Sequence, residues 1–226
     1  MKSRHRTRKG QRGRFLQPAP LLDGMARTWP IGWCKLTFVT AMCYLITHPE
    51  VVVDASAPVD QWSLSPAGRA RAGRLGRLPW TAHLDRVISS AERKAVETAE
   101  MLGTALRLTP EVDPGLGEND RRATGFLPPD EFERVADAFF GSPSTSVRGW
   151  ETAVAAQRRV VEAVQRHTAD RPGSIAFVAH GAVGTLLWCD LQGVPINRAH
   201  DQPGQGSWYA FDPEHWTALH PWVRID

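Results

Sequence analysis

Two short apolar segments, far apart in the chain, each end on a histidine. The first covers residues 42–48 and stops at Pro49, which lacks a backbone N–H and discourages further strand pairing. The second covers residues 174–180. Both have the length of a buried strand, and side chains at the carboxyl ends of strands in an open α/β sheet lie where such folds bind ligands. A single histidine after an apolar run is commonly structural, but the pair favours one site that contains both His48 and His180.

Strand-like and helix-like segments alternate through the rest of the chain. We expect strands at residues 84–90, 106–113, 207–211 and 218–225, and helices at residues 65–78, 92–106, 130–140, 150–168 and 182–191. Ser90 and Asp130 are the expected N-caps of the second and third helices. Residues 114–129 form a long loop, either a functional segment or a solvated one. The alternation predicts an α/β fold, a three-layer α/β/α sandwich whose mostly parallel sheet has an antiparallel edge.

Basic side chains are concentrated ahead of the first apolar segment. Residues 1–41 hold nine Lys or Arg and a single acid, Asp23, which leaves a net charge of −5 for residues 42–226. The basic segment is interpreted as a disordered tail, as an arm for nucleic acid or anionic membrane, or as sequence upstream of a natural start at Met42. A signal peptide is rejected, because its removal would take away the strand that carries His48. We therefore expect a tail, 1–41, and a domain, 42–226.

The remaining composition is that of a globular intracellular protein. Hydrophobic residues make up 42% and charged residues 23% of the chain, and no apolar run approaches the length of about 20 residues that spans a bilayer. The three cysteines are too few and too scattered for a disulfide framework or a cysteine metal site. These features favour a cytoplasmic location, no membrane partner, and nucleic-acid binding only through the basic tail.

Four segments of the chain, in order, resemble motifs of the histidine phosphatase superfamily, which includes the phosphoglycerate mutases. The first three are Thr47-His48-Pro49, where the family has Arg-His-Gly; Leu64-Ser65-Pro66-Ala67-Gly68, at a helix start; and Ser89-Ser90-Ala91-Glu92-Arg93-Lys94-Ala95-Val96-Glu97-Thr98-Ala99. The fourth is Ala179-His180-Gly181, and a weaker fifth match is Leu116-Gly117-Glu118. The resemblance runs from about Met42 to the C-terminus, and it implies a phosphoglycerate mutase-like fold.

The resemblance also implies roles for individual residues. His48 would be the nucleophile that forms a phosphohistidine, His180 and Lys94 would hold the phosphoryl group, and Glu118 would be the general acid and base. The remaining implied phosphate contacts are Arg93, Thr47 and Gly181. The implied activity is that of a phosphomonoester phosphatase acting on a phosphorylated small molecule, with no metal and no cofactor.

The chain departs from the family motifs where arginine would bind phosphate. Thr47 stands in place of the arginine before the first histidine, and Lys94 in place of the second arginine, with Arg93 one residue earlier. Lysine is a point charge that cannot make the bidentate fork of a guanidinium. Two hypotheses therefore stay open: a phosphatase, or a catalytically impaired relative that binds a phosphorylated small molecule.

Overall fold

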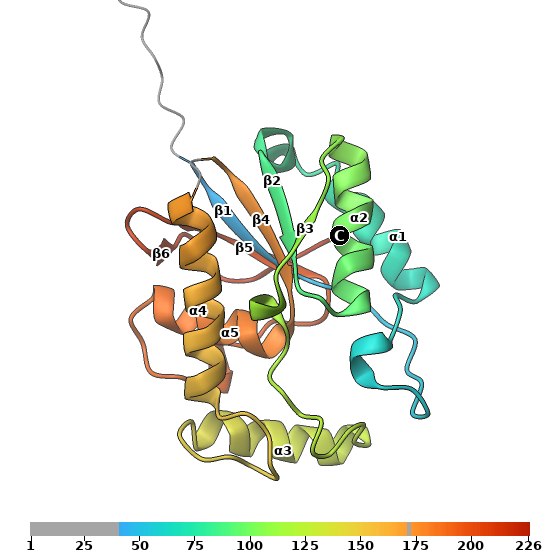
Figure 1. The fold of residues 1–226 in the computed structure, drawn as a ribbon, viewed down its shortest axis with the longest axis vertical. Coiled ribbons are helices and arrows are strands. Elements are labelled where there is room, and N and C mark those ends of the chain that lie inside the picture. Colours follow the sequence, from blue (N-terminus) through green and yellow to red (C-terminus); the bar gives the residue numbers. More distant parts are fainter. Residues whose placement is uncertain (1–40, 171–172) are drawn as a thin grey trace, which may run out of the picture. The chain divides into compact units, whose positions relative to one another are not determined.

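The computed structural model describes residues 41–170 and 173–226. The expectations for residues 1–40 lie outside this part of the chain. The described residues form one sheet with helices on both of its faces (Figure 1). This is the expected three-layer α/β/α arrangement.

The sheet of the described residues has seven strands in the order β3-β2-β4-β1-β5-β6, with β7 also paired to β5. Their bounds are β1 Cys43–Thr47, β2 Arg86–Ser89, β3 Glu111–Val112, β4 Ile175–Ala179, β5 Ser207–Asp212, β6 Thr217–Ala218 and β7 Val223–Arg224. Strands β1 to β4 are mutually parallel, whereas β5 runs antiparallel to β1, and β6 and β7 run antiparallel to β5. The prediction of a mostly parallel sheet with an antiparallel edge is confirmed.

Helices cover the two faces of the sheet in separate groups. The helices are α1 Pro66–Leu75, α2 Arg93–Leu106, α3 Pro129–Gly141, α4 Ala153–Asp170 and α5 Gly181–Leu191, with short 3-10 turns η1 Val59–Gln61, η2 Pro79–His83, η3 Pro114–Leu116 and η4 Arg198–His200. Helices α1 and α2 lie on one side of the sheet and α4 and α5 on the other, with α3 across one end (Figure 1). Within the described residues, no helix is long and apolar enough to cross a membrane.

Alternating side chains along the central strands fill the two cores. On β1, Leu45 packs into the cluster under α4 and α5, and its neighbour Ile46 packs into the cluster under α1 and α2. On β4, Phe177 and Val178 divide in the same way. Because these strands are buried on both faces, they are continuous apolar runs rather than alternating ones. Each of these two apolar runs is followed directly by a histidine, His48 after β1 and His180 after β4.

Several predicted boundaries were wrong. The strand expected at residues 106–113 is only the two-residue β3, because Arg107 ends α2 in a left-handed conformation with φ of 60° and only Glu111 and Val112 pair with β2. The late strand expected at residues 218–225 is split into β6 and β7. The expected capping residues also differ: Glu92 precedes α2 in place of Ser90, and Pro128 precedes α3 in place of Asp130.

The start of α1 supports the segment that follows His48. Ser65 caps this helix by accepting a hydrogen bond from the Gly68 N–H at 3.0 Å, and Pro66 occupies the first turn. A Cβ atom on Gly68 would overlap the carbonyl oxygen of Glu50. Glycine at this position therefore permits direct contact between α1 and the backbone two residues after the histidine.

We predict that Gly68→Ala destabilises the protein by about 1–3 kcal/mol, because the added methyl group must push the Glu50 backbone away from α1. Gly73→Ala on the same helix is the matched control, since its Cβ would meet only Met101 Cε, at an ordinary 3.7 Å. That control should be neutral or stabilising by up to about 1 kcal/mol. Urea denaturation of both variants measures the difference, and equal stabilities would contradict this account of Gly68.

Candidate active site

The sheet brings His48 and His180 together, as the sequence predicted. Each follows the last residue of its strand, and Thr47 pairs with Ala179 in the parallel register of β1 and β4. The two imidazole rings lie with their centroids 5.2 Å apart and their planes inclined by 64°. The His48 N–H also donates to the carbonyl of Ala179 at 3.2 Å, which extends the pairing to the first histidine.

The imidazole of His48 is oriented by a backbone contact. Its Nδ1 lies 2.8 Å from the carbonyl oxygen of Pro49, which can only accept, so Nδ1 carries the proton and Nε2 keeps a free lone pair. Burial, and then the positive charge of Lys94, lower the pKa of His48 from 6.5 to about 4. The ring is therefore neutral near pH 7, which is the form that attacks an electrophile.

The second histidine is enclosed more completely. His180 has no exposed surface, and burial lowers its pKa well below the usual value. Its Nε2 lies 2.6 Å from Ser90 Oγ and 3.3 Å from a carboxylate oxygen of Glu92. A carboxylate accepts hydrogen bonds, so its proximity favours the tautomer with a proton on Nε2. Ser90, expected to cap α2, instead contacts this histidine.

Glu118 lies at the N-terminus of α5. Its carboxylate accepts hydrogen bonds from the backbone N–H groups of Val183 at 3.2 Å and Ala182 at 3.3 Å. Burial raises the pKa of Glu118, although the nearby Arg121 opposes the shift. A carboxyl group with a raised pKa is suited to donate and recover a proton near neutral pH.

A guanidinium from α4 fixes the segment that carries Glu118. Arg159 donates to the carbonyl oxygens of Gly115 and Gly117, each at 2.9 Å, and to that of Glu118 at 3.2 Å. Glu151 pairs with the same guanidinium at 2.8 Å. The loop expected at residues 114–129 is therefore anchored at the point where its acidic side chain enters the site.

Lys94 is buried and already paired. Its side chain is 3% exposed, and its Nζ donates to the carbonyl of Val59 at 3.0 Å and to a carboxylate oxygen of Glu92. The other oxygen of Glu92 accepts from the Glu118 N–H at 2.8 Å. Although burial favours the neutral acid, His180 and Lys94 lower the pKa of Glu92 to about 2. The site therefore contains a partly buried, ionised carboxylate that sequence reasoning did not identify.

The other residues implied by the family motifs are distributed differently. Thr47 is buried, bonded to Gln202 at 2.5 Å and Ser207 at 3.0 Å, and does not line the cavity described below. Arg93 is exposed and paired with Glu97 on the surface of α2. Gly181 does line the cavity, and a Cβ there would lie 2.5 Å from Nε2 of Gln202.

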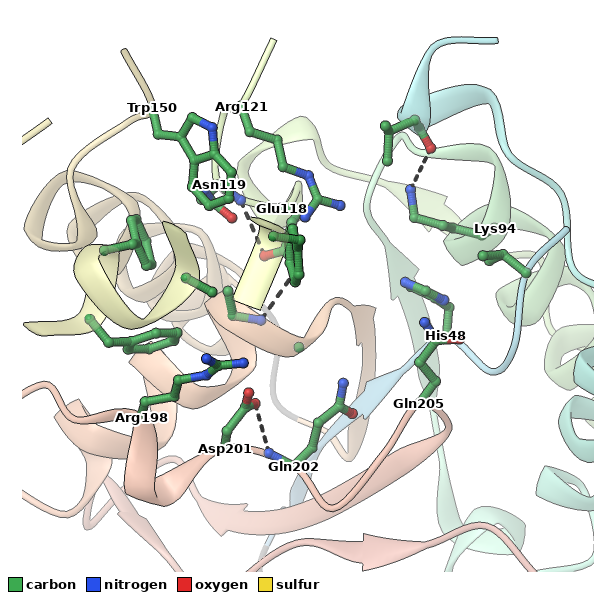
Figure 2. A pocket seen from close by; sticks show the side chains of 18 of the residues that line it. His48, Lys94, Glu118, Asn119, Arg121, Trp150, Arg198, Asp201, Gln202 and Gln205 are labelled. Atoms are coloured by element: carbon green, nitrogen blue, oxygen red, sulfur yellow. Dashed lines mark hydrogen bonds between the residues drawn. The ribbon is translucent and has the colours of Figure 1, made fainter. Parts of the chain in front are cut away.

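A cavity of about 170 Å³ opens in front of His48. Figure 2 shows Glu118 and Arg121 on one side of it and His48 and Lys94 on the other. Polar side chains from the segment before β5 complete the wall: Asp201, Gln202 and Gln205. Among the described residues, no group of three or more His, Cys, Asp or Glu is arranged to hold a metal ion.

A family model for the histidine phosphatase superfamily (branch 1) matches residues 44–221, so the protein belongs to that superfamily. The expectation from the motifs is thereby confirmed. No curated protein sequence matches this chain.

Several solved structures share the fold. Bacillus stearothermophilus YhfR is 26% identical, with a TM-score of 0.68 over 82% of this chain and 97% of that one. A mycobacterial glucosyl-3-phosphoglycerate phosphatase is 20% identical, with a TM-score of 0.65 over 81% of this chain and 96% of that one. A putative α-ribazole-5'-P phosphatase from Escherichia coli is 23% identical, with a TM-score of 0.61 over 80% of this chain and 94% of that one.

We predict that Glu92→Gln tightens the binding of inorganic phosphate by about tenfold, because it removes a negative charge next to Lys94 and His180. The same change should lower the free energy of unfolding by about 2 kcal/mol, since the buried ammonium loses its counter-ion. Calorimetric titration with phosphate and urea denaturation measure the two effects.

Glu100→Gln is the control, because Glu100 is an exposed acid on the same helix as Lys94. It should change neither quantity. Phosphate affinity that is unchanged or weaker in Glu92→Gln would show that Glu92 does not compete with the anion.

Proposed function

We propose that the protein is a metal-independent phosphomonoester phosphatase that works through a phosphohistidine on His48. The observation that carries the proposal is the bond between His48 Nδ1 and the Pro49 carbonyl, which leaves Nε2 unprotonated at the edge of the cavity. Membership of a phosphatase family supports the reaction class. The buried free thiols of Cys43 and Cys189 support a cytoplasmic location.

The proposed reaction has two steps. In the first, His48 Nε2 forms a bond to phosphorus while the bond to the leaving oxygen breaks, and Glu118 gives that oxygen its proton. In the second, Glu118 takes a proton from water, the water oxygen bonds to phosphorus, and the bond to His48 breaks. His180 donates its Nε2 hydrogen to a phosphoryl oxygen once the substrate replaces Ser90 and Glu92 as the partner of that nitrogen, and Lys94 supplies positive charge.

The proposed substrate class is a phosphorylated small molecule. The cavity volume of about 170 Å³ supports a compact group at the reacting centre. Two of the similar structures carry names of phosphatases for small phosphate esters, and another structure of the mycobacterial phosphatase is a complex with inorganic phosphate. Inorganic phosphate is therefore a reasonable probe for this site as well.

A second candidate is a protein that binds a phosphorylated small molecule without turning it over. The ion pair between Lys94 and Glu92 favours it, because that pair offsets the charge expected to hold the phosphoryl group. Thr47 stands where the family motif has an arginine, so no guanidinium at that position replaces the offset charge. Hydrolysis of a panel of phosphomonoesters without added metal distinguishes the two candidates.

We predict that wild-type protein mixed with a phosphomonoester and quenched in alkali carries an acid-labile phosphate, and that His48→Ala carries none. The reason is that only an unprotonated imidazole nitrogen facing the cavity can form the phosphoramidate bond. His83→Ala is the control, because His83 is exposed outside the cavity, and it should keep the label.

His180→Ala should keep the fold and lose turnover, since its ring would assist the transfer rather than carry the phosphate. Circular dichroism checks the fold, and the rate of ester hydrolysis checks the turnover. Equal labelling of the wild type and His48→Ala would remove His48 from the reaction.

A further inference from the structure

Four cationic side chains line the active-site cavity or the adjoining one, and three of them are paired with carboxylates. The adjoining cavity, of about 570 Å³, shares Val59, Glu118, Asn119 and Arg121 with the first. The paired cations and their partners are Lys94 with Glu92, Arg122 with Asp120, and Arg198 with Glu133 and Asp137. The fourth is Arg121, which has no ion-pair partner within residues 41–170 and 173–226.

Arg121 lies three residues after Glu118, on the same anchored segment. Its guanidinium carbon sits 5.0 Å from the centroid of the Phe132 ring, a cation–π contact that supports one face of the planar group. In Figure 2 the guanidinium lies beside Glu118 and is directed toward the side of the cavity that holds Lys94. Its nitrogen atoms are therefore free to donate to a ligand in that space.

The proposed chemistry needs such a donor. The phosphoryl oxygens carry charge that fixed donors must stabilise, and a guanidinium does so with two parallel hydrogen bonds. Thr47 is buried away from the cavity, Arg93 points to solvent, and Lys94 is offset by Glu92. None of these three provides an uncompensated positive charge.

We propose that Arg121 is the arginine that binds the phosphoryl oxygens in this site, together with His180 and Lys94, taking the role that an arginine at position 47 would have. This inference rests on the proposed function and adds a binding residue to it. Arg121 and Glu118 lie on the side of the cavity opposite His48, so Arg121 contacts the phosphoryl group on its leaving-group side (Figure 2). One segment thus supplies both the proton for the leaving oxygen and the charge that holds the transferred group.

The test measures phosphate binding and ester hydrolysis separately, in the full chain. Calorimetric titration with inorganic phosphate should give a dissociation constant at least about tenfold larger in Arg121→Ala than in the wild type. Arg121→Lys should recover only part of the loss, because an ammonium cannot make the bidentate contact. The catalytic efficiency with a simple aryl phosphate should fall by a similar factor in Arg121→Ala.

The matched control is Arg122→Ala, which removes the same charge from the next residue. The Arg122 side chain is 91% exposed and paired with Asp120, so phosphate affinity should stay within about twofold of the wild type. Equal losses in both variants would indicate only a general electrostatic effect and would overturn the assignment. So would unchanged affinity in Arg121→Ala, or no measurable phosphate binding in the wild type.

The inference and the proposed function can fail separately. If phosphate affinity depends on Arg121 but the wild type hydrolyses no phosphomonoester, the binding assignment holds and the phosphatase proposal fails. If Arg121→Ala hydrolyses esters as well as the wild type does, the phosphatase proposal holds and the assignment of Arg121 fails.

Discussion

The parallel pairing of β1 with β4 is the constraint on which the site depends. These strands are distant in the sequence, yet the register that aligns Thr47 with Ala179 sets the two following histidines beside each other. A shift by one residue would turn every side chain of β1 to the opposite face of the sheet. It would place Leu45 and Ile46 in the wrong cores, so the packing of both hydrophobic layers fixes the strand register. The register in turn fixes the distance between the two imidazoles.

Burial at this edge of the sheet sets the protonation state of each acid and base in the site. Burial lowers the pKa values of His48 and His180, so both rings are neutral. Burial raises the pKa of Glu118. Glu92 is only partly buried, and it stays ionised because His180 and Lys94 favour the charged form of its carboxylate. The charges of Lys94 and Glu92 thus compensate one another inside the site. The net positive charge that an anionic substrate needs has to come from another segment, and the chain offers it next to Glu118.

The residues that could be predicted from the sequence are those whose placement follows from strand ends and chain order. His48 and His180 belong to this group, whereas Glu118 was expected only from the resemblance to the family motifs. The orientation of Arg93 and Lys94 could not be predicted, because it depends on the residue at which α2 begins, and adjacent residues on a helix point in different directions. Thr47 occupies the position of the family's first arginine, but its hydroxyl group forms hydrogen bonds with Gln202 and Ser207.

Glu92 and Arg121 were missed for another reason. The carboxylate of Glu92 contacts Lys94 on α2, His180 after β4 and the backbone N–H of Glu118, and only the assembled fold brings these together. The absence of an ion-pair partner for Arg121 within the described residues likewise follows from the placement of every neighbouring acid. A local signal did exist for Glu92, since it is an acid two residues before the only lysine after residue 41.

The most direct test of the account is the protonation state of His48 in the folded protein. Long-range proton–nitrogen NMR correlations, assigned by comparison with His48→Gln, report the tautomer and its titration. We expect a neutral ring with the proton on Nδ1 at pH 7, and protonation of Nε2 only near the low pKa of about 4 that burial and Lys94 impose. Because the folded state resists this protonation, stability should also fall as the pH drops from 6.5 toward 4. An imidazolium at pH 7, or a neutral ring with its proton on Nε2, would contradict His48 as the nucleophile.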